Sequence, residues 1–266
     1  MKASARIVAC RGQDGSTRLP VLASQVPLVL RASGDVVRLV AAAGGPLGGD
    51  ELCLDVEVGD GARLELRSVA ASVVLPDRGG RESSLVLRAR VGAGGHLSLL
   101  PQPTVICAGA RHRAQTYVSL APSATLQLRE ILVLGREGEA GGRVSALVHI
   151  DRGGRPLLRS TLDLDGPDST TIGPAVLGGA RAVGSLLTVD PSWEDASLRP
   201  PPWCSDDAAA LDLEGPAQLV TALAGDALTL HRLLPMPGPP RETHPLLTAR
   251  QAISAVSGRA AAHRGE

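Results

Sequence analysis

The sequence predicts an all-β-dominated protein, a β-solenoid or layered body of stacked hairpins with a short C-terminal helical segment. Three observations support this fold class. A strand–turn–strand pattern recurs about every 30 residues, apolar and polar residues alternate within its strands, and the composition contains few large aromatic side chains. We expect two parts, a β-rich body over residues 1–240 and a helical tail over 241–266.

The recurring unit spans residues 53–66, 85–99 and 117–128, with a looser fourth copy at 148–158. Its anchor residues are Val58, Val91, Leu120 and Ile150, which are 33, 29 and 30 residues apart. In the first three copies another apolar residue follows six places later, at Leu64, Leu97 and Leu126, whereas the fourth copy needs seven places to reach Leu157. Because a lone hairpin is barely stable in water, the copies must stack. An ordinary sandwich with similar hairpins remains the alternative.

The composition limits the interior and the partners. Apolar residues make up 44% of the 266 residues, but there is no Phe, one Tyr and two Trp. A core of Leu, Val and Ala suits a narrow, layered interior. The 27 basic and 27 acidic residues balance, which argues against a nucleic-acid binder, and the stacking aromatics of single-strand binders are also missing.

The cysteines and the hydropathy favour a cytoplasmic protein. Cys10, Cys53, Cys107 and Cys204 are scattered without a paired spacing, so no disulfide framework is expected. No signal peptide is evident at the N-terminus. No apolar run approaches the ~18 residues of a membrane span. We therefore expect no membrane association.

The first half of the chain reads as successive strands. Strands are expected at 5–9 and within 26–40, where 27–31 and 35–40 flank a turn. The glycine-rich stretch 43–50 precedes a strand and lacks the Lys-Ser/Thr of a phosphate loop, so its glycines are expected to allow close backbone approach instead. Further on, 68–76 is typical of a buried strand. Two prolines put 100–106 at a sheet edge or bend, and 130–139 is typical of a strand leading into a charged turn.

The second half is less regular. A strand is expected at 184–189, a long loop at 190–207 and renewed strand-like alternation at 227–234. Residues 246–256 have apolar residues at helical spacing. The expected partner-binding residues on that helix are Leu246, Leu247, Ile253 and Val256.

No catalytic constellation is evident, so we do not expect an enzyme. A nucleophile elbow is absent, and the six histidines are not closely paired. Cys107 and His112 are five residues apart without an obvious third metal ligand. A polysaccharide-acting β-helix enzyme requires paired carboxylates and usually aromatic side chains on which sugar rings stack. A chain with three aromatic residues has few candidates for such platforms. A generic β-solenoid binding module is a further alternative.

Glu130 interrupts an apolar strand, and a buried carboxylate without a partner is costly. Its presence between Leu128 and Ile131 calls either for an ion pair with Arg136 or for a hydrophilic path through the body.

Four stretches together resemble the UreD (UreH) family of urease accessory proteins: 44–50, 58–66, 99–106 and 128–139. The residues that carry the resemblance are Gly44, Gly45, Gly49, Asp50, Gly59, Gly61, Pro101, Gln102, Thr104, Glu130, Gly135, Arg136 and Glu139. Two features depart from the family. Ser72-Val73-Val74-Leu75 stands where the family usually has an aromatic residue, and the family's C-terminal Pro-Arg and Trp pattern is not evident.

The resemblance implies a scaffold without catalysis of its own. It implies binding to apo-urease and to a helical UreF-type partner, through which a UreG-type GTPase is recruited, and it is compatible with a dimer inside that complex. No tightly bound cofactor is expected, only transient passage of Ni²⁺ through an internal channel. The acidic candidates for lining this path are Glu130, Glu137, Glu139 and Asp50.

Overall fold

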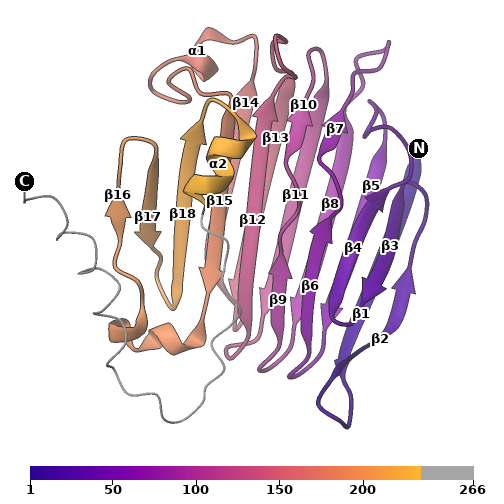
Figure 1. Cartoon of the computed structure of the whole chain (residues 1–266), viewed down its shortest axis with the longest axis vertical. Coiled ribbons are helices and arrows are strands. Elements are labelled where there is room, and N and C mark those ends of the chain that lie inside the picture. Colours follow the sequence, from indigo (N-terminus) through magenta and orange to yellow (C-terminus); the bar gives the residue numbers. More distant parts are fainter. Residues whose placement is uncertain (235–266) are drawn as a thin grey trace, which may run out of the picture. The chain divides into compact units, whose positions relative to one another are not determined.

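The computed structural model describes residues 1–234, and the β-dominated fold class is confirmed, with 55% of residues in strands and 8% in helices. Two sheets lie face to face (Figure 1). Sheet A has the order β14-β13-β11-β8-β5-β1-β2, and sheet B has the order β16-β17-β18-β15-β12-β9-β6-β4-β3. Two short strands, β7 and β10, join sheet B beside β12.

The strands of sheet A are β1 (Lys2–Arg11), β2 (Thr17–Ala23), β5 (Glu51–Val58), β8 (Ser83–Val91), β11 (Arg111–Leu120), β13 (Arg143–Arg152) and β14 (Arg155–Asp165). Those of sheet B are β3 (Leu28–Ser33), β4 (Val36–Ala41), β6 (Arg63–Ser68), β7 (Ser72–Val74), β9 (His96–Leu99), β10 (Thr104–Ile106), β12 (Thr125–Leu134), β15 (Ala182–Val189), β16 (Trp203–Cys204), β17 (Ala208–Asp212) and β18 (Ala217–Ala224). The helices are α1 (Ser169–Ile172), α2 (Ala227–Leu233) and the 3₁₀ turns η1 (Pro191–Glu194) and η2 (Ala196–Leu198).

The predicted stacking of the copies is confirmed residue by residue. In sheet A, Val91 pairs with Val58 on one side and with Leu120 on the other. In sheet B, Leu97 pairs in the same way with Leu64 and Leu126. Ile150 of the fourth copy pairs with Val118, two residues before Leu120. The fourth copy, whose spacing in the sequence is irregular, is therefore the one whose anchor residue is shifted in register.

The two strands of each regular copy do not form a hairpin, which corrects the expected pairing. β5 and β6 lie in opposite sheets, as do β8 and β9, and β11 and β12. The chain therefore crosses between sheets at each glycine turn, and each strand pairs in parallel with the next copy. Gly61 donates its N–H to the carbonyl of Ala93 in the neighbouring turn, at 2.8 Å. The fourth copy is a hairpin, because β13 and β14 pair antiparallel within sheet A.

The interior is built from small aliphatic side chains, as the composition predicts. Alternate residues of both sheets point into the space between them. Ile7, Leu64, Leu97 and Leu126 are fully buried there. A layered core of this kind closes without large aromatics because each layer repeats nearly the same side chains.

The remaining expectations are met in part. β3 and β4 form the predicted hairpin, and 104–106 forms a short strand between β7 and β12 at the predicted bend. The glycine-rich loop allows the close approach expected of it, because a Cβ on Gly48 would lie 2.6 Å from the carbonyl oxygen of Arg81. The expected helix at 246–256 and the boundary at 240 lie outside the described residues.

Ala227–Leu233 form helix α2, with Leu234 as its C-cap, so the strand expected over 227–234 is wrong. The Asp226 side chain accepts a hydrogen bond from the N–H of Thr229 at 2.8 Å and caps the helix. Leu230 and Leu234 are four residues apart and both fully buried, against Gly184 of sheet B. The apolar pattern of this segment fits either a strand or a helix. The cap at Asp226 and the burial of Leu230 and Leu234, four residues apart, decide for the helix.

Replacing Asp226 with Ala is expected to loosen α2 while the two sheets persist. The N–H of Thr229 loses its acceptor, and the first turn frays. Amide exchange should accelerate within 227–234 and stay unchanged in β11 and β12. Asp195→Ala, which removes the cap of the surface turn η2, is the matched control, and equal acceleration in both variants would contradict this role of Asp226.

Candidate functional site

Three neighbouring cavities lie between the two sheets. The first, of about 140 Å³, is lined by Asp50 and by apolar residues of β3, β4 and β5. The second, of about 130 Å³, shares Leu39, Ser68, Ser72 and Leu85 with the first. The third, of about 220 Å³, shares Leu128, Glu130 and Leu132 with the second. The cavities thus follow one another across the strands, from the β4–β5 loop towards β14 and β18.

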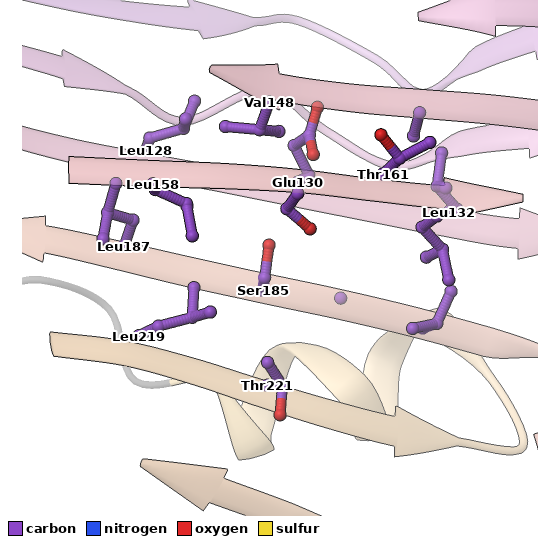
Figure 2. Close-up of a pocket in the computed structure, with 15 residues that line it drawn as sticks. Leu128, Glu130, Leu132, Val148, Leu158, Thr161, Ser185, Leu187, Leu219 and Thr221 are labelled. Carbon is purple, nitrogen blue, oxygen red and sulfur yellow. The ribbon is translucent and has the colours of Figure 1, made fainter. Parts of the chain in front are cut away.

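Glu130 stands where the second and third cavities meet. It occupies an inward position of β12 between Leu128 and Leu132 (Figure 2), and it lines both cavities. Burial raises the pKa of its carboxyl from 4.5 to about 7, although a hydrogen bond with the Thr116 side chain opposes the shift. Near neutral pH this carboxyl is therefore present in both its protonated and its ionised form.

A row of polar side chains extends from Glu130 across sheet B. Glu130 pairs in register with Ser185, and Ser185 pairs with Thr221. Figure 2 shows these three side chains with Thr161 of β14 around the third cavity. The next inward row on one side is apolar and consists of Leu128, Leu187 and Leu219. The polar row is thus a narrow hydrophilic strip in an aliphatic interior.

His112 adds a second titratable group to the second cavity. It is 2% exposed, and its Nδ1 lies 2.9 Å from Oγ of the buried Ser83. Burial lowers the pKa of its imidazole from 6.5 to about 4. Because the folded value is depressed, His112 favours the folded state above pH 6.5, and this contribution is lost as the pH falls towards 4. At neutral pH His112 is an uncharged, polar wall of the cavity.

Asp50 lines the first cavity but is already engaged in local structure. Its carboxylate forms an ion pair with the amino group of Met1 and accepts a hydrogen bond from the N–H of Leu47 at 2.9 Å. Burial alone would raise its pKa, but these contacts outweigh burial and hold the pKa below its usual value. Asp50 therefore fixes the glycine-rich loop just before the start of β5.

The other two acidic candidates lie on the turn after β12. The Arg136 side chain, and next the Arg136 N–H, bond to Glu139 and lower the pKa of its carboxyl to about 2. Glu137 is exposed. Since Arg136 pairs with Glu139 at 2.8 Å, the alternative of a Glu130–Arg136 ion pair is wrong. Gly135 allows this turn, because its φ is +74° and a Cβ would lie 2.3 Å from the carbonyl oxygen of Glu139.

The structure brings two of the four predicted path residues to the cavities and leaves two at the surface. Two other residues that carry the family resemblance form hydrogen bonds within the fold. The N–H of Gln102 donates to Oγ of Ser68 at 2.8 Å, and the carbonyl of Pro101 accepts from Arg129 at 3.1 Å. Thr104 begins β10. Sequence reasoning missed Thr116, Ser185 and Thr221, for which the available signal was a polar residue at an inward strand position.

A permanent metal cage is not formed by the part of the chain that the structure describes. Within residues 1–234, no three His, Cys, Asp or Glu side chains gather as ligands, so Cys107 and His112 do not find the third ligand that they lacked. Cys107 and His112 are both buried, and burial raises the pKa of the Cys107 thiol. None of the helices described over this range is long and apolar enough to cross a membrane.

Comparison with known proteins identifies relatives along almost the whole described chain. The family described as UreD urease accessory protein matches residues 1–234. A urease accessory protein UreD of Frankia alni is 43% identical, and the alignment covers 88% of this chain and 91% of that protein. The UreD protein of Streptomyces avermitilis is 42% identical, with 88% and 95% covered. That of a Parafrankia species is 44% identical, with 83% and 82% covered.

Proposed function

The chain belongs to the UreD family of urease accessory proteins, and from this premise we propose that it is a cytoplasmic scaffold that binds apo-urease and supports delivery of nickel to it. A UreF-type protein is the proposed direct partner, and a UreG-type GTPase joins through that protein. In this role the chain acts without catalysis of its own. The relatives are named accessory proteins, which supports a binding role.

The observation that carries the nickel proposal is Glu130 at the junction of two interior cavities. We propose that Ni²⁺ passes along the cavities as cargo, in contact with Glu130 and then with the hydroxyls of Ser185 and Thr221. Conduction requires sites that bind weakly enough to release the ion. A single carboxylate followed by hydroxyl oxygens meets that requirement better than a closed set of imidazole and thiolate ligands.

The acidic residues divide into two roles in this proposal. Asp50, at the first cavity, shapes the entrance, since its carboxylate is held by the Met1 amine and the Leu47 N–H. Glu139 and Arg136 stabilise the turn after β12, and Glu137 is exposed on the same turn. The tail residues Leu246, Leu247, Ile253 and Val256 stay predictions as a partner contact.

Deleting the gene is expected to leave urease expressed but without nickel. Urease purified from the deletion strain and from the strain complemented with the full chain should be compared for subunit yield, bound nickel and activity. Loss of nickel at unchanged subunit yield supports the scaffold role. A pulldown of the full chain with apo-urease tests the contact itself, and normal nickel content in the deletion strain would contradict the proposal.

A further inference from the structure

Sheet B is wider than sheet A on one side of the molecule. The turn between β11 and β12 places these two strands opposite each other in the two sheets. Beyond them sheet A has β13 and β14, whereas sheet B has β15, β18, β17 and β16. β14 faces β18 across the third cavity, through residues such as Leu158 and Leu219. The next strand of sheet B, β17, therefore has no strand of sheet A opposite it.

The uncovered face of β17 is apolar. Ala208 and Ala210 belong to one apolar cluster with Leu230 of α2 and with Leu234, its C-cap, on the side of sheet B away from sheet A. Residues in between point the other way in a strand, so Ala209 and Leu211 face the side on which sheet A lies. Leu211 is 51% exposed there. In register it continues the apolar row of Leu187 and Leu219 past the edge of sheet A.

The edge strand beside the uncovered face of β17 has unused backbone groups. β14 is the edge strand of sheet A. The N–H and C=O groups of every second residue along it therefore point away from β13. The start of β14 is blunted by Pro156, by an irregular register at Asp151 and by the Arg159 side chain, which donates to the carbonyl of Leu158 at 2.9 Å. The stretch from Leu158 to Leu162 contains neither proline nor bulge. This open stretch lies at the level of Leu219 and Thr221, which also line the third cavity.

We propose that an extended segment of a partner protein adds to sheet A as a strand alongside Leu158–Leu162, over Ala209 and Leu211. The site requires aliphatic side chains at alternate positions, to pack on β17. Between them an antiparallel segment would place an acidic residue opposite Arg159 and a basic residue opposite Asp163. Within residues 1–234 Asp163 makes no ion pair, and Arg159 has the single ion pair with Asp151.

The width of the uncovered strip favours one strand over a second copy of this chain. Strands lie about 4.8 Å apart, and beyond β17 only the two-residue β16 remains before sheet B ends, among the residues described. Two copies joined antiparallel through β14 would keep both sheets B on the same side. The strands β17 and β16 of each copy would then occupy the space that the other copy needs.

The test uses a tethered peptide, because a single added strand binds weakly and a tether supplies a millimolar effective concentration. The probe is Lys-Val-Thr-Val-Glu-Val followed by a flexible Gly-Ser linker and a terminal Cys. It is attached by a disulfide to the exposed Cys204 of the full chain carrying Cys10→Ser and Cys53→Ser, in which the remaining Cys107 is buried. We expect amide exchange over Leu158–Leu162 to slow by roughly tenfold or more, and exchange at the opposite edge, β2, to stay unchanged.

Three controls distinguish strand addition at β14 from nonspecific protection by the tethered peptide. A probe N-methylated at alternate residues, so that the amides facing β14 cannot donate, should give no protection. Leu211→Asp should abolish protection, whereas Leu228→Asp, an exposed leucine on α2 at the opposite face of sheet B, should not. The proposal is overturned if the tethered probe protects nothing, or if Leu211→Asp retains full protection. Protection of the edge without any probe also overturns it: a second copy occupies the site if that protection grows with protein concentration, and residues 235–266 occupy it if it does not.

Discussion

Glu130→Gln is expected to raise the free energy of unfolding by up to about 3 kcal/mol near pH 8, and to leave it unchanged near pH 4. Glu130 titrates near 4.5 when unfolded and at about 7 when folded. Between these values the unfolded chain has lost a proton that the folded chain retains, so stability falls as pH rises through this interval. Gln keeps the shape and the hydrogen-bonding capacity without the charge, and it removes this loss.

His112 makes the shape of the pH profile diagnostic. Its depressed pKa lowers stability as pH falls from 6.5 to about 4, a slope opposite to that of Glu130. In the natural chain the two slopes cancel between about pH 4.5 and 6.5. Glu130→Gln should therefore uncover a rise of about 1.4 kcal/mol per pH unit, and His112→Gln should uncover the opposite slope. Denaturant midpoints measured across this range, with an unchanged m-value, check both, and a Glu130→Gln profile parallel to that of the natural chain would refute a buried, titrating Glu130.

The same Glu130→Gln substitution is expected to reduce the nickel content of urease about tenfold or more while the accessory complex forms in normal yield. The proposed path loses the carboxylate that lines both cavities at their junction, and a neutral amide is a weaker ligand for a divalent cation. Because the variant is expected to be the more stable protein, a loss of nickel together with a raised free energy of unfolding could not be assigned to misfolding. Such an opposition between stability and function is common where a buried charge serves a site.

The measurement pairs nickel per urease with the yield of complex, in cells that carry the variant in place of the natural gene. Glu137→Gln, which neutralises an exposed carboxylate on the turn after β12, is the matched control and should leave nickel transfer through the interior intact. Nickel content and yield both normal in Glu130→Gln would remove Glu130 from the path. Low yield with low nickel would instead assign Glu130 to assembly.

The layered body could be predicted from the sequence because its repeat has a physical cause. Val58, Val91 and Leu120 recur since each must fill the same position in successive layers, and they pair as expected. The crossing between sheets could not be predicted, because a glycine turn between two alternating strands fits a hairpin and an arch equally well. α2 was missed because its leucines satisfy both periods, and the cap at Asp226 decides between them.

For the candidate site, the sequence indicated an interior position for Glu130 but not the residues around it. Glu130 stands out in an apolar strand, and the cavities confirm that this position is interior. Its neighbours Ser185 and Thr221 come from strands 55 and 91 residues further along the chain, and only the register of sheet B brings them beside it. Arg136 was the nearest candidate partner in sequence, but the tight turn at Gly135 directs it to Glu139.

Because the cavities follow one another across the strands, the repeat of the layers sets the distance that the cavities span. Each layer contributes one strand spacing of about 4.8 Å, so the distance from the Asp50 end to the Thr221 end is set by the number of layers between them and not by the lengths of the turns. Relatives can thus lengthen or shorten their surface loops freely and keep that distance, whereas gaining or losing a whole layer changes it in one discrete step.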